Sequence, residues 1–468
     1  MRLWLEFFKC VFKLRKACSR KATFYWMAIA LIGFSTRPDK AGVTSLVRAT
    51  FLKSKFYPSL LHFFNSSALK VHRLTACWIS LVLKLFRPVL YLDHLVLLLD
   101  GVKVSKEGRK MPAVKKLHQA SSNNSKAPFI FGHSFQALGL LVHSTMDSVV
   151  SIPLVARIHE GIILSSLHRQ TLPQKAHGLL SSLFSQSKQH ILVVADAYYA
   201  THKFIDPLLN DGNHLLTRVK HNVVAFEEAP RSNLRKRGRP KLYGEKVLLR
   251  DLWGKKNLFE EATMSFYGDP PVTFRFCLID LLWRPVRRKV RFVLVDHPIR
   301  GRIILMTTML SMDPLSAIRL YAARFKIEVS FKSAIHTVGA FAYRFWMKLW
   351  KPNKGRRGDQ FLHKKSKRYR EKALAKIEAY HRFIQLAFIG QGLLLHLAIN
   401  FRKIVWARFP TWMRTMKTNA APSEWVVSET LKSGLPGFLL GKVEDPTFKK
   451  IFAGKIDFDK LPGIRLSA

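Results

Sequence analysis

The chain has 468 residues, of which 78 are Lys or Arg and 30 are Asp or Glu, so its formal net charge is +48. A hydrophobic fraction of 48% supports a large folded core and excludes a disordered chain. So large a positive charge repels itself unless a polyanion neutralises it. Nucleic acid is the expected polyanion, and an anionic membrane surface is the alternative.

Residues 1–90 predict an N-terminal helical domain, because apolar clusters are broken by Arg and Lys and punctuated by prolines. We expect this domain to bind DNA or to form a dimer. Its apolar run at 23–34 is shorter than the about 20 residues that a membrane span needs. We therefore expect a buried helix and no membrane partner, with membrane anchoring as the alternative.

The cysteines are scattered along the chain, at Cys10, Cys18, Cys77 and Cys277. No Cys-x2-Cys pair or Cys/His cluster has the spacing of a zinc site, and no disulfide framework is visible. This usage argues against structural zinc and is typical of a protein in a reducing cytoplasm.

A mixed α/β core is predicted for residues 91–219 and 301–345. An apolar strand at 95–99 runs into Asp100, and another at 191–195 runs into Asp196. Between them we expect two strands around a polar turn at 132–136, and then a crossover helix. Because ligands bind at the carboxyl ends of strands in α/β folds, both aspartates are candidate site residues. In the simpler interpretation Asp100 is a turn residue and Asp196 a helix cap.

Residues 220–300 predict a β-rich basic insertion, since a basic turn is followed by strand-like alternation. The motif RKRGRP at 235–240 is typical of a minor-groove hook. In that interpretation Arg235, Arg237 and Arg239 contact DNA; a solvated loop is the alternative.

A helix is expected at 318–336, where Asp313 can cap its start and Pro314 can occupy the first turn. Apolar side chains recur at the spacing of one buried face, at Ile318, Ala322, Phe325 and Val329. Polar side chains share another face, at Tyr321, Arg324, Glu328 and Lys332. Taken alone, Glu328 would be an ion-pair partner of the neighbouring cations.

Residues 346–468 predict a basic linker followed by a C-terminal helical region. The stretch 351–376 carries eleven Lys and Arg residues, which we expect to contact DNA rather than to form a merely solvated face.

Three carboxylates, Asp100, Asp196 and Glu328, thus close or face core elements in the order strand, strand, helix. Carboxylates are the protein ligands that Mg²⁺ prefers. Two such ions clamp the attacking and leaving oxygens of a phosphodiester. The pattern therefore indicates metal-assisted chemistry on nucleic acid.

The motif YAARFKIE at 321–328 matches the Tyr-x2-Arg-x3-Glu signature of bacterial DDE insertion-sequence transposases. The segments LLLDGVKVSKEGRKMPAVKKLHQ, FIFGHSFQALG and VVADAYYA resemble the first and second acidic blocks of the same group. The resemblance spans about residues 95–336 and implies a ribonuclease-H-like catalytic domain with a β-rich insertion.

By this resemblance Asp100, Asp196 and Glu328 are the metal-binding triad, and Tyr321 and Arg324 contact phosphates near the cleaved end. One position differs from the pattern of the family: the family usually has a lysine seven residues after the glutamate, and this chain has Ile335 there. Lys332, one turn nearer, is the candidate substitute. Similar transposases stack a flipped base on an aromatic residue of the insertion, which makes Trp253 a candidate; core packing is the alternative.

The expected function is a transposase that cuts DNA at element ends and joins the 3′-hydroxyl to target DNA. The resemblance implies two Mg²⁺ ions, with Mn²⁺ as the alternative. It also implies a homodimer on double-stranded DNA in the bacterial cytoplasm, associated with the nucleoid. The alternatives are a nuclease of the same fold and a decayed or domesticated copy that only binds DNA.

Overall fold

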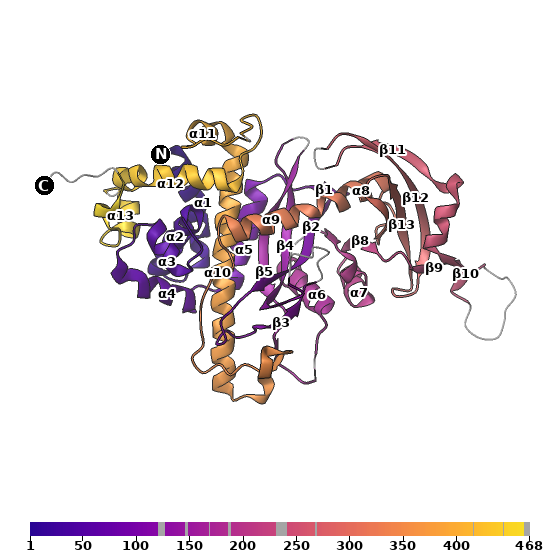
Figure 1. Cartoon of the computed structure of the whole chain (residues 1–468), viewed down its shortest axis with the longest axis horizontal. Coiled ribbons are helices and arrows are strands. Elements are labelled where there is room, and N and C mark those ends of the chain that lie inside the picture. The colour runs from indigo at the N-terminus through magenta and orange to yellow at the C-terminus, as the bar shows by residue number, and fades with distance from the viewer. Residues whose placement is uncertain are drawn as a thin grey trace. The chain divides into compact units, whose positions relative to one another are not determined.

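The computed structural model describes residues 1–119, 127–145, 148–167, 169–185, 189–230, 241–266, 269–414, 416–442 and 444–462 (Figure 1). The chain forms two compact units. The first unit comprises Met1–Pro88, Gly101–Arg169 and Glu328–Ala468, and the second comprises Val89–Asp100 and Gln170–Ile327. The N-terminal and C-terminal helices thus belong to one unit, whereas the domain boundaries expected from the sequence assign them to separate regions.

The first unit is organised around α10 (Lys367–Asn400), against which helices from both ends of the chain pack (Figure 1). The N-terminal helices are α1 (Arg2–Lys13), α2 (Lys21–Thr36), α3 (Val43–Ala49), α4 (Tyr57–Asn65) and α5 (Val71–Leu85). The C-terminal helices are α11 (Arg402–Ala407), α12 (Glu424–Lys442) and α13 (Pro446–Phe452). Residues 379–398 of α10 are all buried, as expected for a helix that is covered by neighbouring elements on every side.

Among the described residues, α10 is the one helix long and apolar enough to cross a membrane. However, 89% of its most apolar window is buried inside the protein, so in this fold α10 is a core helix. The apolar run at 23–34 lies in α2, which is buried along most of its length and contacts α10. The prediction of a buried helix there is confirmed.

The strands of the first unit centre on β4 (Phe129–His143), which pairs antiparallel with β3 (Lys115–His118) and β5 (Val149–Ile158). The predicted break at 132–136 is wrong, because β4 is continuous. Its polar residues find partners inside the fold: His133 Nδ1 lies 2.6 Å from the Tyr343 hydroxyl, and Nε2 lies 2.8 Å from the carbonyl oxygen of Pro112. A hydrogen-bonded imidazole can be buried within a strand, so polarity did not mark a turn here.

The second unit contains a mixed sheet with the strand order β10-β9-β12-β13-β14-β8-β7-β2. Its parallel part consists of β2 (His94–Ser105, which continues into the first unit), β7 (Ile191–Ala195) and β8 (His214–Val219). The antiparallel strands are β9 (Val224–Glu228), β10 (Tyr243–Leu248), β12 (Val272–Trp283), β13 (Arg288–His297) and β14 (Gly301–Thr307). Two short strands lie off this path, β1 (Leu90–Tyr91) on β2 and β11 (Glu260–Met264) on β12.

Helices supply the crossovers that parallel strands need. In the second unit α6 (Leu172–Phe184) precedes β7, and α7 (His202–Asn210) connects β7 to β8. A capping box between Thr171 and Gln174 fixes the start of α6. Another helix, α8 (Pro314–Ala323), packs on β7, β8, β13 and β14. The predicted mixed α/β fold, with a β-rich insertion and helical regions at both ends, is confirmed.

The packing of α10 on α5 yields a stability prediction. A methyl group on Gly392 of α10 would overlap the ring of Trp78, which is fully buried and donates a hydrogen bond from Nε1 to the Pro153 carbonyl oxygen at 2.9 Å. Gly392→Ala should therefore destabilise the protein by about 1–3 kcal/mol despite the better helix propensity of alanine. Thermal unfolding followed by circular dichroism measures the shift.

The matched control is Gly437→Ala in α12, where an added methyl group would meet no atom within 4 Å. This variant should unfold at the same temperature or slightly above it. Equal effects of the two substitutions would contradict the packing argument.

Candidate active site

Asp100 and Asp196 occupy neighbouring positions on two parallel strands of the second unit. Leu99 of β2 pairs in register with Ala195 of β7, and an aspartate follows each of them. Asp100 lies within β2, which continues to Ser105, and is therefore not a turn residue, whereas Asp196 directly follows the end of β7. Residues 95–99 and 191–195 are buried, because both faces of these strands are covered. The apolar pattern that forms the strands thus also brings two carboxylates to one edge of the sheet.

The next strand and the following turn fix the backbone at Asp196. Its side chain accepts a hydrogen bond from the Tyr198 amide at 3.0 Å and caps a short 3-10 turn. Its carbonyl oxygen accepts a hydrogen bond from Thr217 Oγ1 of β8 at 2.7 Å. Asp196 therefore has the capping role considered from the sequence, and it remains part of the carboxylate pair.

The guanidinium of Arg324 lies directly on Asp100. Arg324 Nη1 is 2.9 Å from Asp100 Oδ2, and these side chains are only 19% and 17% exposed. Arg324 follows the last residue of α8, which packs on the same sheet. The fold thus places a cation where two like charges would otherwise repel.

Tyr321 lies one turn before Arg324, and the charges of Asp196, Arg218 and Arg324 affect its pKa. Burial raises the pKa of Tyr321, and Asp196 adds to that effect, while Arg324 and Arg218 oppose it. The phenol therefore stays protonated at neutral pH and can donate a hydrogen bond. Tyr321 and Arg324 also line a pocket of about 230 Å³ with His297 and Arg300.

The expected single helix at 318–336 is two helices, α8 and α9 (Phe325–His336). At the junction, the Arg324 amide bonds to the Tyr321 carbonyl oxygen and the Ile327 amide to that of Arg324. These hydrogen bonds join residues three positions apart, whereas those of an α-helix join residues four apart. The side chains after the junction therefore point in other directions than a continuous helix would give them. The predicted buried face is wrong in its second half, since Phe325 is 46% exposed and Val329 47% exposed.

The remaining predicted residues belong to other elements. Glu328 is in the first turn of α9 and is the first residue of the C-terminal part of the first unit; Lys332, one turn later, is exposed. Trp253, in the second unit, stacks on Phe259 with ring centroids 5.5 Å apart and lies 5.2 Å from the Arg302 guanidinium carbon. The residues of the proposed hook, Arg235, Arg237 and Arg239, lie outside the described residues.

A larger pocket, of about 580 Å³, lies in the first unit beside Ile335. Its lining includes Lys40, Lys106 and Arg344, together with Trp346. Burial, and then the charge of Arg344, lowers the pKa of Lys106 to about 7. Ile335 therefore shares this pocket with three basic side chains, of which Lys106 is buried.

Sequence reasoning missed the cations at Lys106, Arg218 and Arg344 and the hydroxyl of Thr217. Thr217 and Arg218 could have been found, because they lie near the carboxyl end of β8, the third parallel strand. Lys106 and Arg344 carry no such signal, since residues 235 or more positions away complete their surroundings.

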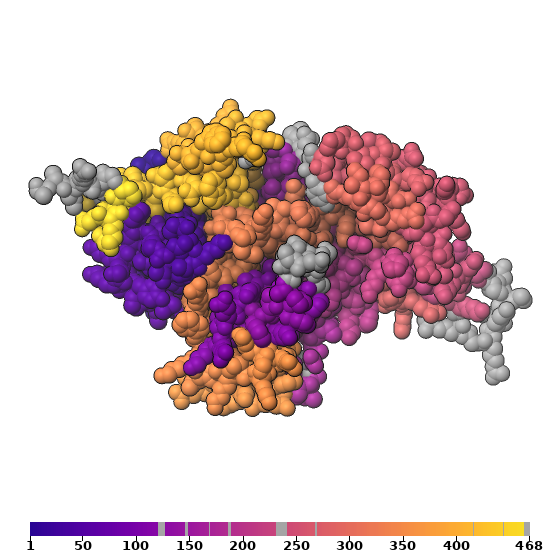
Figure 2. Space-filling view, in the orientation of Figure 1, coloured from indigo at the N-terminus to yellow at the C-terminus, as the bar shows by residue number. Residues whose placement is uncertain are grey.

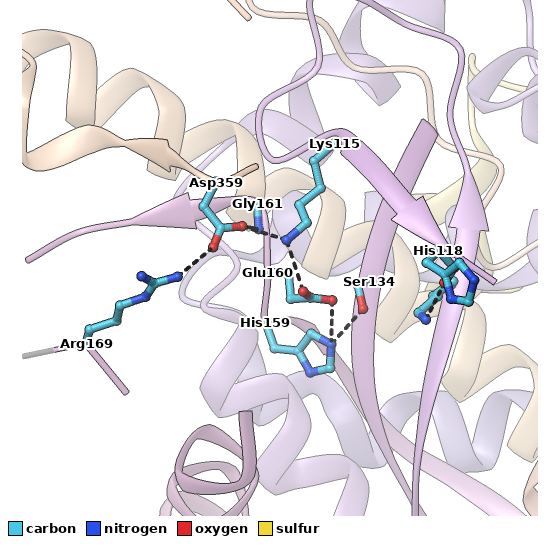
Figure 3. A network of polar contacts seen from close by, with 9 residues as sticks. Lys115, His118, Ser134, His159, Glu160, Gly161, Arg169 and Asp359 are labelled. Carbon is cyan, nitrogen blue, oxygen red and sulfur yellow. Dashed lines mark hydrogen bonds and ion pairs between the residues drawn. The ribbon is translucent and has the colours of Figure 1, made fainter. Parts of the chain in front are cut away.

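The basic stretch 351–376 is anchored in the first unit by a polar network (Figure 3). Lys115 Nζ lies 3.0 Å from Glu160 and 2.8 Å from Asp359, and Asp359 also accepts a hydrogen bond from the Gly161 amide at 2.9 Å. Next to Asp359, β15 (Gln360–Phe361) pairs in parallel with β6 (Ile162–Ile163). Most residues of this stretch are exposed, and they form the lower orange surface in Figure 2.

Removing the cation of this network tests its strength. Burial acts to raise the pKa of Glu160, but hydrogen bonds from Ser134 and Lys115 outweigh it and hold the pKa below its usual value. Lys115→Met should cost about 1–3 kcal/mol at pH 7, because two carboxylates lose their counter-ion. A lowered carboxyl pKa contributes stability above pH about 4.5 that is lost below it. The cost should therefore shrink as the pH falls below 4.5.

Denaturant unfolding at pH 7 and at acidic pH measures this cost. Lys116→Met is the control, since Lys116 lies on the same strand and contacts the Phe129 ring instead of a carboxylate. A cost for Lys115→Met that does not depend on pH would refute the ionic origin.

The Arg324–Asp100 pair gives a second stability test. Arg324→Met removes the guanidinium that neutralises Asp100 and should destabilise the protein by about 1–3 kcal/mol. Arg319→Met, an exposed position on α8, should change stability by less than about 0.5 kcal/mol. Equal unfolding midpoints for the two variants would show that the pair contributes nothing.

Comparison with known proteins adds one finding. The family model described as DDE superfamily endonuclease matches residues 6–263, which is more than half of the chain. The matched region contains Asp100 and Asp196 and ends before Tyr321, Arg324 and Glu328. A search of curated proteins finds no match.

Proposed function

The chain belongs to the DDE superfamily of endonucleases, and from that premise we propose that it is a DDE transposase. It would cut DNA at the ends of its element and join the 3′-hydroxyl to target DNA. The observation that carries the proposal is the pair Asp100, within β2, and Asp196, directly after β7, at neighbouring positions with Arg324 and Tyr321 beside them.

The donor set at this edge fits a divalent cation. Asp100 and Asp196 form a site that attracts positive charge. The Arg324 guanidinium already contacts one of these carboxylates, that of Asp100. We assign Asp100, Asp196 and Glu328 as the residues that would hold Mg²⁺, or Mn²⁺, as two ions. When bound, such ions stabilise charge on the reacting phosphodiester and on the attacking oxygen.

The protein's own groups would bind the substrate. Arg324 neutralises Asp100 in the structure, and its guanidinium is a natural partner for a DNA phosphate oxygen. The protonated phenol of Tyr321 can donate a hydrogen bond to a second phosphate oxygen. Phosphoryl transfer depends mainly on such positioning and charge stabilisation.

Lys332 is our candidate for the family's missing lysine. Its side chain is exposed on α9, one turn beyond Glu328, where it can approach a phosphate. Ile335 itself is half-buried at the pocket that Lys40, Lys106 and Arg344 line. Lys40 and Arg344 are exposed and would provide a further positive surface in the first unit for the DNA backbone.

Other parts of the chain would hold DNA away from the reacting phosphate. The anchored basic stretch 351–376 and the net charge of +48 support a long backbone contact. The hook residues Arg235, Arg237 and Arg239 would enter a minor groove, and Trp253 would stack on a base. We further propose a homodimer on double-stranded DNA, in the bacterial cytoplasm and associated with the nucleoid.

The decisive experiment is cleavage of supercoiled DNA that carries the gene's own flanking sequence, with Mg²⁺ or with EDTA. Asp100→Asn, Asp196→Asn and Glu328→Gln should each lower the cleavage rate roughly a thousandfold, about 4 kcal/mol in the barrier. Binding of the same DNA, measured by gel shift, should change by less than about tenfold.

Glu245→Gln is the control, because Glu245 is an exposed carboxylate on β10. Tight binding with no metal-dependent cutting by the wild-type chain would favour the decayed copy, for which Ile335 is the supporting observation. Cutting without joining to target DNA would favour the nuclease.

A further inference from the structure

Three potential metal ligands from two helices meet in the first unit, apart from the carboxylates described above. Glu6 and Cys10 lie four residues apart on one face of α1, and His396 projects from α10. Their ligand atoms all lie within 4.8 Å of one another. The cluster is invisible in the linear spacing, because His396 is 390 residues from Glu6.

The cluster is buried in the helical core. Cys10 is 0% exposed and His396 6% exposed, and the side chain of Glu6 is 19% exposed. A carboxylate and an imidazole at such a place need partners that satisfy them. Glu6 Oε1 lies 3.4 Å from His396 Nε2, and Glu6 Oε2 lies 3.4 Å from Lys9 Nζ.

The distance of 3.4 Å between His396 Nε2 and Glu6 Oε1 can be compared with that of a hydrogen bond and with that of two ligands of one metal ion. A hydrogen bond between nitrogen and oxygen usually measures about 2.9–3.0 Å. Two ligand atoms bound tetrahedrally to zinc, each about 2.0–2.1 Å from the metal, lie about 3.3–3.4 Å apart. The contact between the imidazole and the carboxylate is therefore long for a hydrogen bond and compatible with two ligands of one metal ion.

The imidazole of His396 is held in orientation from its other side. The Asn400 side-chain amide lies 3.1 Å from Nδ1, and the rings of Phe86 and Phe401 meet the imidazole at 6.0 and 5.9 Å between centroids. These contacts direct Nε2 toward Glu6. The same amide nitrogen also donates to the His396 carbonyl oxygen at 3.1 Å, so the Asn400 side chain is fixed on the side of the imidazole away from Glu6.

We propose that Glu6, Cys10 and His396 bind one Zn²⁺ ion that joins α1 to α10. A thiolate, an imidazole and a carboxylate are all zinc ligands, and the two negative charges balance the ion. The partial exposure of Glu6 leaves room for water as a fourth ligand. The ion would fix the first helix of the chain to the core helix of the first unit, a structural role separate from DNA cleavage.

The Cys10 thiol must lose its proton to bind a metal ion. Burial, and then the charge of Glu6, raises the pKa of Cys10 to about 11. Without metal the group is a neutral thiol and packs as a small apolar side chain. A bound zinc ion displaces that proton, so binding releases protons.

The test is Co²⁺ titration of the metal-free full-length chain, expressed without a histidine tag, followed by optical absorption. A thiolate bound to Co²⁺ gives a near-ultraviolet charge-transfer band, and tetrahedral coordination gives intense visible bands. We expect both at one equivalent, their loss on adding one equivalent of Zn²⁺, and a rise of several degrees in the unfolding temperature with Zn²⁺.

Cys10→Ser should abolish the charge-transfer band, and His396→Gln should weaken Co²⁺ binding at least tenfold. Cys18→Ser is the matched control, because Cys18 is also buried among the N-terminal helices, and it should leave the band intact. Circular dichroism checks that each variant folds. Absence of the band in the wild-type chain, or its persistence in Cys10→Ser, overturns the proposal.

Discussion

The pairing of β2 with β7 places the carboxylates of Asp100 and Asp196 at neighbouring positions. Other groups of the second unit must compensate these two negative charges. Leu99 and Ala195 are partners in a buried parallel ladder, so Asp100 and Asp196 follow at the same level. A stable fold must supply positive charge or hydrogen-bond donors there. Arg324 and the Tyr198 amide come from two different segments to do so. The helix that brings Arg324 also brings Tyr321, so charge compensation and the proposed phosphate contacts have one structural origin.

The same principle explains how so basic a chain folds. Acidic residues are scarce, and several of them neutralise a cation within the sheet or between segments. In the insertion Arg291 bonds Asp280 across β13 and β12, and Arg275 bonds Asp296 across the same pair. Asp359 fixes the start of the basic stretch 351–376. Carboxylates thus stabilise the scaffold, while the excess of cations is left on the surface for a polyanion.

The sequence predicts those features that depend on local periodicity. The strands at 95–99 and 191–195, the buried helix at 23–34 and the mixed α/β class all follow from short apolar patterns. The failures arise where a distant partner overrides local polarity. His133 stays in a strand because Tyr343 and Pro112 satisfy its ring, and the helix at 318–336 breaks at Arg324. Of the candidate site, the positions of Asp100 and Asp196 could be predicted, but the cations that surround them could not.

The burial of α10 has a consequence for the order of synthesis. The helices at 1–88 pack on a helix that begins at Lys367, so they remain without their main partner until most of the chain has left the ribosome. The second unit, in contrast, is complete in sequence at Ile327. Domains generally fold as units during synthesis. The second unit can therefore fold first. Until α10 has been synthesised, the apolar faces of the helices at 1–88 stay exposed, and a chaperone can bind to them.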